Sequence, residues 1–214
     1  MKGICYIEPL FIATAAGTKI NTRRLINPQP YGKLFQASDS GDFWIQSEKS
    51  GEFKPRYKVG EKVYLKEPYK LVSHIANLVN IELKYSKTTI TIDMFQHKTR
   101  EKSVEWVNKR LKEQNKSKSG YCNKMFMPEF CANNFIEITA VRAERLQDIS
   151  DEDCLKEGII DFSSEYMKSY TFDGTRHLYG TPSEAFATLI DKICGKGTWE
   201  GNPYMWAYDF KMVE

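Results

Sequence analysis

The 214-residue sequence lacks both a long apolar run and an early apolar leader. Its longest apolar stretch, Leu10 to Ala16, is far shorter than the ~18 residues that a membrane helix needs. An acid at Glu8 interrupts the N-terminal segment too early for a secretory signal peptide. We therefore expect a cytoplasmic protein without a membrane partner.

The sequence also lacks the motifs of metal and nucleotide cofactors. Its five cysteines form no C-x-x-C pair, and its three histidines are scattered without zinc-finger spacing. Gly195-x-Gly197 has no third glycine at the spacing of a dinucleotide-binding loop, and it follows a predicted helix instead of preceding one. We expect no cofactor, no metal, and reduced cysteines that are mostly buried.

The chain as a whole has almost no net charge, but two of its segments carry a strong excess of one sign. The chain has 31 Lys and Arg against 28 Asp and Glu, a net charge of +3. Residues 84–118 contain ten basic and four acidic side chains, a net of +6, whereas residues 144–173 contain nine acidic and three basic ones, a net of −6. With 41% hydrophobic residues, the composition excludes collagen, low-complexity disorder and a disulfide-knotted mini-protein.

The basic stretch contains a predicted helix from Ser103 to Glu113, with Val104, Val107 and Leu111 on one face, followed by a flexible loop at 115–120. An insertion that merely faces solvent and a flap that contacts phosphates are both compatible with this pattern. Candidate nucleic-acid-binding residues are Lys109, Arg110, Lys112, Lys116 and Lys118.

Helix-capping signals predict three further short helices. They begin at Pro9, after Ser150 and after Thr181, where proline or a capping side chain stands at the first turn. Glycines placed to end them are Gly17, Gly158 and Gly195. The apolar face of the third helix comprises Phe186, Leu189, Ile190 and Ile193.

Six short segments have the composition of strands. They are Gly3–Ile7, Phe43–Gln46, Lys62–Lys66, Thr88–Met94, Phe135–Val141 and Tyr204–Met212. Because regular crossover helices do not separate most of them, the pattern favours an α+β fold with a mixed, mainly antiparallel sheet or small barrel.

The most unusual string runs from Gly17 to Arg24. It places three cations and two hydroxyls within seven residues, at a turn that glycine makes possible. On residue chemistry alone, this string is either a site for an anion or polar ligand or an exposed basic turn.

The residues Gly17-x-Lys19-x-x-Thr22-x-Arg24 resemble the signature of ASCH domains, relatives of the PUA fold. Four further blocks resemble the same family, the last of them its larger phage- or prophage-encoded members. They are residues 57–69, 126–128 with 136–142, 146–158 and 199–210. The resemblance covers most of the chain outside 70–123. It implies one PUA-like domain over 1–214, a small β-barrel flanked by short helices, with a basic insertion at about 84–118.

One bacterial branch of this family hydrolyses the amide of 4-N-acetylcytidine with Lys, Thr and Glu. The resemblance places Lys19, Thr22 and Glu157 at those positions. Thr22 would be the nucleophile and Lys19, with a pKa lowered by burial or by neighbouring arginines, its base. Glu157 would position both or shuttle a proton. Catalysis then requires the three groups to lie within hydrogen-bond reach.

The candidates for substrate binding are Arg23, Arg24, Glu67 and Trp206. Arg24 could hold the substrate carbonyl, Trp206 could stack on a pyrimidine, and Glu67 is expected to form a salt bridge with Arg23 or Arg24. Alternatively, Lys19 and Arg24 bind a phosphate and Thr22 is a strand residue bonded to backbone. Asn133-Asn134 departs from the Ser-Arg that larger family members usually carry, so one basic contact is missing.

Two other functions compete with amide hydrolysis of a nucleoside. PUA-like barrels often recognise RNA, so the chain could be a non-catalytic RNA-binding module that uses its basic insertion. Ribonuclease activity is suspected for some ASCH proteins, but no histidine pair or metal cluster supports it here.

Overall fold

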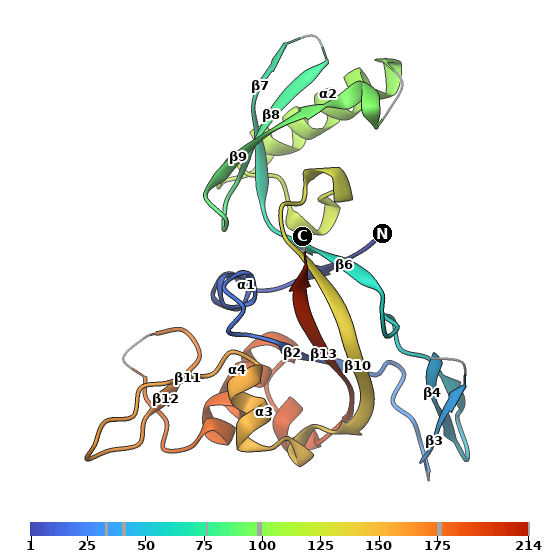
Figure 1. The fold of residues 1–214 in the computed structure, drawn as a ribbon, viewed down its shortest axis with the longest axis vertical. Helices are drawn as coiled ribbons and strands as arrows, with labels where there is room; N and C mark the ends of the chain where they lie inside the picture. The colour runs from blue at the N-terminus through green and yellow to red at the C-terminus, as the bar shows by residue number, and fades with distance from the viewer. Residues whose placement is uncertain (33, 40–41, 76, 98–99, 175–176, 214) are drawn as a thin grey trace. The chain divides into compact units, whose positions relative to one another are not determined.

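A computed structural model of the chain describes residues 1–32, 34–39, 42–75, 77–97, 100–174 and 177–213. Helices and several small, mainly antiparallel sheets confirm the predicted α+β class (Figure 1). Among the described residues every sheet has a linear strand order, so none closes into the barrel that the resemblance implies. None of the helices described is long and apolar enough to cross a membrane.

The chain divides into two compact units. The first unit comprises residues 1–12 and 62–135, and the second comprises 13–61 and 136–213. The basic stretch at 84–118 belongs to the first unit, apart from residues 98 and 99, which lie outside the described residues.

The first unit combines a parallel strand pair, a three-stranded antiparallel sheet and one long helix. Its strands are β1 (Lys2–Cys5), β6 (Lys62–Lys66), β7 (Tyr69–Ile75), β8 (Leu78–Leu83) and β9 (Thr88–Asp93). Its helical segments are α2 (Arg100–Lys116) and the 3₁₀ turns Met94–Gln96, Lys124–Phe126 and Glu129–Cys131. Strand β1 pairs with β6, and β7, β8 and β9 pair in sequence order. Helix α1 (Glu8–Ala15) follows β1.

Helix α2 packs along the β7–β8–β9 sheet (Figure 1). Val107 joins Tyr69 and Ile81 in the buried core between them. The inward face repeats at helical spacing through Ser103, Val107 and Arg110, all buried. The predicted placement of Val104 on that face is wrong, because its side chain is 55% exposed.

The second unit contains three small sheets and three helices. Three of the five strands of the main sheet belong to this unit, in the order β10 (Phe135–Arg145), β13 (Tyr204–Val213) and β2 (Asn21–Leu25). The other strands are β3 (Leu34–Asp39), β4 (Asp42–Ser47), β5 (Gly51–Phe53), β11 (Ile160–Asp161) and β12 (Tyr170–Thr171). The helical segments are the 3₁₀ turn Leu146–Asp148, α3 (Asp151–Lys156), α4 (Pro182–Cys194) and α5 (Thr198–Gly201). Helices α3 and α4 lie side by side (Figure 1).

Two predicted helix starts, after Ser150 and after Thr181, are confirmed by their capping hydrogen bonds. Ser150 Oγ accepts from the Asp153 N–H at 3.1 Å, and Thr181 Oγ1 accepts from the Glu184 N–H at 3.1 Å. Each contact satisfies a backbone donor that the first helical turn leaves without a partner. The helices predicted from Pro9 and Ser103 begin earlier, at Glu8 and Arg100. The predicted apolar face of α4 extends too far, because Ile193 is 42% exposed.

The cysteines are free thiols, as expected. Cys122, Cys131 and Cys154 are buried, Cys5 is partly buried and Cys194 is exposed. Burial raises the pKa of Cys154 to about 12, so this thiol stays protonated at neutral pH.

Candidate functional site

The turn before β2 directs Lys19 toward the end of α3. Gly17 has a φ of +75°, in the left-handed region that glycine adopts without a steric penalty. The backbone N–H groups of Thr18 and Lys19 both donate to Ala13 O at 3.0 Å, and the Ile20 N–H donates to Lys156 O at 3.0 Å. The first two contacts close the C-terminal end of α1, and the third holds the turn against α3.

Lys19 and Glu157 form a fully buried ion pair. Lys19 Nζ, whose side chain is 0% exposed, donates to Glu157 Oε2 at 2.6 Å, to Glu157 O at 2.7 Å and to Asn21 O at 2.6 Å. Three acceptors match the three protons of an ammonium group. The ammonium lies at the C-terminus of α3, where a positive charge is favourable, and it offsets the Glu157 carboxylate at the same end.

Arg23 shares the Glu157 carboxylate from the other side. Its Nη1 donates to Glu157 Oε1 at 3.2 Å, its Nη2 donates to Asp153 Oδ2 at 3.0 Å, and its Nε donates to Glu144 Oε1 at 2.7 Å. The guanidinium is therefore surrounded by three carboxylates. Glu157 in turn lies between two cations, one on each of its oxygens.

Arg142 extends this network along β10. It donates to Glu144 Oε2 at 2.9 Å, Asp153 Oδ2 at 2.5 Å and Asp209 Oδ2 at 2.7 Å. Asn21 donates from Nδ2 to Asp209 and accepts from Arg23 Nη1 at 3.1 Å. We call the assembled side chains the ion cluster. Its members are Lys19, Asn21, Arg23, Arg142, Glu144, Asp153, Glu157 and Asp209. Three cations face four carboxylates in it, and Lys156 adds a fourth cation 3.5 Å from Asp153 Oδ1, so the formal charges of these side chains balance.

Sequence reasoning missed Asn21, Arg142, Glu144, Asp153 and Asp209 as members of one site. The available signal was their spacing within strands. Asn21 and Arg23 are two residues apart, as are Arg142 and Glu144, and such pairs share a face of a strand. The pairing register that brings Asp209 opposite Asn21 could not be read from one sequence.

The charge state of Lys19 reflects opposing influences. Burial lowers the pKa of Lys19 below 10.5, the charge and hydrogen bond of Glu157 act in the opposite direction, and Arg24 and Arg23 lower it further. The resulting pKa of Lys19 is lowered from its ordinary value. Lys19 is therefore placed to lose a proton more readily than an exposed lysine.

Arg23 and Asp153 of the ion cluster are held in their charged forms. Burial acts to lower the pKa of Arg23, but Glu157 and Glu144 outweigh it, so the pKa is raised. Burial acts to raise the pKa of Asp153, but the hydrogen bond from Arg23 and the charge of Arg142 lower it below 3.8. Asp153 therefore stays ionised well into acidic conditions.

Thr22 and Arg24 belong to the opposite face of β2 from Arg23, since successive side chains of a strand alternate. They pair with Tyr208 and Trp206 of β13 respectively. Thr22 is 3% exposed and Trp206 is 5% exposed. The structure thus joins Lys19, Glu157 and Arg23 directly, and it groups Thr22 and Arg24 with two buried aromatic residues.

Glu67 is held by partners other than the arginines expected for it. In the first unit its carboxylate accepts from the backbone N–H of Tyr85 at 2.5 Å, the N–H of Ser86 at 2.8 Å and the Ser86 hydroxyl. Burial raises its pKa, and these hydrogen bonds act against the rise. Arg23 has its carboxylate partners within the ion cluster.

The five candidate nucleic-acid-binding residues fall into two groups. Lys109, Lys112 and Lys116 are exposed and lie at i, i+3 and i+7 on the outer face of α2, and Lys118 is exposed just beyond it. Arg110 differs, because it is only 7% exposed and its Nη1 donates to Glu113 at 2.6 Å. Its helical position, three residues after Val107, turns it into the core.

No family model, curated protein or solved structure matches the chain. Within the part of the chain that the structure describes, no three His, Cys, Asp or Glu side chains are grouped to hold a metal ion.

Proposed function

We propose that the chain is an ASCH-type, PUA-like protein that hydrolyses the amide of a modified nucleoside such as 4-N-acetylcytidine. The observation that carries the proposal is the contact of 2.6 Å between the fully buried Lys19 Nζ and Glu157 Oε2. A buried lysine with a lowered pKa beside a carboxylate is the arrangement that amide hydrolysis by a Lys, Thr and Glu set requires.

The reaction begins with a proton transfer within the ion pair. As an ammonium with three hydrogen bonds, Lys19 cannot accept a proton. Passage of one proton from Nζ to Glu157 Oε2 over 2.6 Å leaves a neutral amine and a neutral carboxylic acid. Burial favours this state because it leaves two fewer charges shielded from water, whereas the charge of Arg23 beside Glu157 Oε1 opposes it.

Among the described residues, Thr22 lies on the strand face opposite to Arg23 and forms no hydrogen bond with Lys19. A water molecule must therefore carry the proton of the Thr22 hydroxyl to the neutral Lys19 amine as the oxygen attacks the amide carbon. The tetrahedral intermediate collapses when the same proton passes from Lys19 to the departing cytidine amine, and the acetyl group stays bonded to Thr22 Oγ1 as an ester. Water then cleaves this ester and restores the hydroxyl. Arg24, on the same strand face as Thr22, would stabilise the oxyanion, and Trp206 beside it would contact the pyrimidine.

The test is release of acetate and cytidine from 4-N-acetylcytidine by the purified protein. Lys19→Ala, Thr22→Val and Glu157→Gln should each lower turnover at least 100-fold. Matched controls are Thr188→Val and Glu152→Gln, which alter exposed side chains of helices α4 and α3. Thr22→Val is nearly isosteric and removes none of the hydrogen bonds of the ion cluster, so its loss of activity would not be a loss of fold. Full turnover in both Lys19→Ala and Thr22→Val contradicts the proposal.

Exposed lysines on α2 favour RNA binding as a second function. Lys109, Lys112 and Lys116 present three charges along one helix face to solvent, the arrangement that neutralises successive phosphates. If the chain binds RNA and catalyses no reaction, its affinity for RNA should fall steeply as the salt concentration rises. Replacing these three lysines should weaken that salt dependence, and no acetate should be released from 4-N-acetylcytidine. Binding that does not change with salt would exclude this second function.

A further inference from the structure

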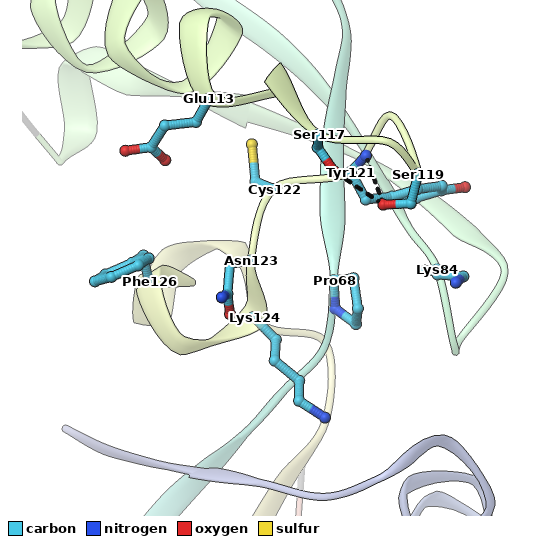
Figure 2. A pocket seen from close by; sticks show the side chains of 10 residues that line it. All are labelled: Pro68, Lys84, Glu113, Ser117, Ser119, Tyr121, Cys122, Asn123, Lys124 and Phe126. Atoms are coloured by element: carbon cyan, nitrogen blue, oxygen red, sulfur yellow. Dashed lines mark hydrogen bonds between the residues drawn. The ribbon is translucent and has the colours of Figure 1, made fainter. Parts of the chain in front are cut away.

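The first unit contains an open pocket that shares no residue with the ion cluster. Its volume is about 530 Å³, within the ~300–1,000 Å³ typical of small-molecule sites. Pro68 and Lys84 supply part of its lining, and the rest comes from Glu113 and the segment between 117 and 126 (Figure 2).

Backbone hydrogen bonds hold the walls of this pocket in place. The Lys84 N–H donates to Pro68 O at 2.9 Å, and the Cys122 N–H donates to Tyr69 O at 2.7 Å. The hydroxyls of Ser117 and Ser119 lie 3.0 Å apart on the loop after α2. The loop therefore presents two hydroxyl groups at a fixed place on the pocket wall.

The pocket has a positive charge balance. Lys84 and Lys124 line it together with one acid, Glu113, whose carboxylate is bound by Arg110 Nη1 at 2.6 Å. Lys84 is exposed and forms no ion pair with any carboxylate in the described ranges, and its Nζ lies 5.6 Å from the centre of the Tyr121 ring. The exposed Lys118 adjoins the same loop. An anionic group would therefore be attracted to this wall.

An exposed aromatic ring forms another part of the wall. Phe126 is 63% exposed, although a large apolar side chain is usually covered. The Arg110 guanidinium lies 6.0 Å from its ring centre. Asn123 stands between Phe126 and the lysines, with its Oδ1 accepting from the Met125 N–H at 2.9 Å (Figure 2). The pocket thus combines a flat apolar surface with a fixed amide and a basic, hydroxylated rim.

We propose that this pocket binds a ribonucleotide, with the phosphate held by Lys84 and the hydroxyls of Ser117 and Ser119 and the base lying against Phe126. A basic, hydroxylated wall beside an exposed aromatic ring favours a ligand that has both an anionic group and a flat ring. A purely apolar ligand would bury the Lys84 ammonium without an anionic partner, and an anion without a ring would leave Phe126 in water. The inference goes beyond the proposed amide hydrolysis, since it concerns a different unit of the chain.

Isothermal titration of the purified protein with the four ribonucleoside 5′-monophosphates tests the site. At least one of them should bind more tightly than its unphosphorylated nucleoside and more tightly than inorganic phosphate. Lys84→Gln and Phe126→Ala should each weaken that affinity about tenfold or more, the loss expected for one charge-assisted hydrogen bond or one stacking contact. The control Lys102→Gln alters an exposed lysine of α2 that does not line the pocket, and it should leave the affinity unchanged.

Three results would overturn the proposal. They are the absence of binding by all four nucleotides at millimolar concentration, equal binding of inorganic phosphate and nucleotide, and equal weakening by Lys84→Gln and Lys102→Gln. A Lys19→Ala protein should still bind the nucleotide, so failure of this site and failure of amide hydrolysis are separately visible.

Discussion

The ion cluster of the second unit and the exposed lysines of the first unit differ in how the protein surrounds its basic side chains. In the cluster, Lys19 and Arg23 are buried and each has carboxylate partners within hydrogen-bond distance. In the first unit, Lys84 and Lys112 are exposed. Basic side chains that are paired with carboxylates of the protein stabilise the fold. Basic side chains that face solvent remain able to pair with a negatively charged ligand.

This contrast predicts that Arg23 and its carboxylate partners contribute mainly to stability and that the exposed lysines of the first unit contribute mainly to affinity for anionic ligands. The same substitution of a cation should therefore destabilise the chain in one unit and weaken binding in the other.

The largest expected effect comes from Arg23→Met. The variant leaves Glu144, Asp153 and Glu157 without a shared guanidinium in a buried site, and breaking a buried pair in this way costs about 3–5 kcal/mol. Urea denaturation measures the free energy of unfolding. The control Lys211→Met removes a cation that is 60% exposed and 3.5 Å from Glu137, and it should cost less than about 1 kcal/mol. Equal losses in the two variants would contradict the contrast.

Asp153→Asn should cost about 1.5–3 kcal/mol at pH 7, the range for hydrogen bonds to charged groups. Because the folded-state pKa of Asp153 is lowered, its carboxylate contributes stability that is present above the ordinary value of 3.8. This contribution is lost as the pH falls through the folded-state pKa. The difference in unfolding free energy between the wild type and Asp153→Asn should therefore shrink below pH 3.8. A difference that grows on acidification has the wrong sign for this account.

Arg110→Ala should lower stability, as a substitution in the ion cluster does, although Arg110 lies in the basic stretch. Its side chain is 9% exposed and pairs with Glu113, so we expect a loss of about 1–2 kcal/mol of stability. The salt dependence of RNA affinity should stay unchanged, because the guanidinium faces inward. If Arg110→Ala instead flattens that salt dependence without a loss of stability, its assignment to the core is wrong.

The double variant Lys112→Gln and Lys116→Gln should have the smallest effect on stability, within about 0.5 kcal/mol. If RNA is bound, removing two phosphate contacts reduces the slope of log affinity against log salt by about 2. Filter binding over a series of salt concentrations measures the slope. An unchanged slope would show that this face of α2 does not contact RNA.

Local signals in the sequence were sufficient for several elements. Ser150 and Thr181 were identifiable as helix caps because the capping hydrogen bond reaches only three residues along the chain. All six predicted strands correspond to observed ones, and Lys62–Lys66 has the observed bounds of β6. Seven strands of the described chain were not predicted, namely β2, β3, β5, β7, β8, β11 and β12. In β2 the polar residues Asn21 to Arg24 favour a turn, although a strand position for Thr22 is one of the alternatives.

The candidate site was only partly predictable. Resemblance to a family motif singled out Lys19 and Glu157, which lie 138 positions apart in the sequence and 2.6 Å apart in the structure. Arg142 and Asp209 reach the same cluster through strand pairing, which leaves no local pattern. The burial of Arg110 was readable from its helical spacing to Val107, but its charge suggested a surface position.

The central claim is that burial makes Lys19 a proton acceptor while Glu157 opposes this tendency. NMR titration of the Lys19 amine in the wild type and in Glu157→Gln tests it directly. The account predicts a pKa below 10.5 in the wild type and a still lower pKa in the variant, because the charge of Glu157 raises it. A wild-type pKa at or above 10.5, or a higher pKa in Glu157→Gln, would contradict the account.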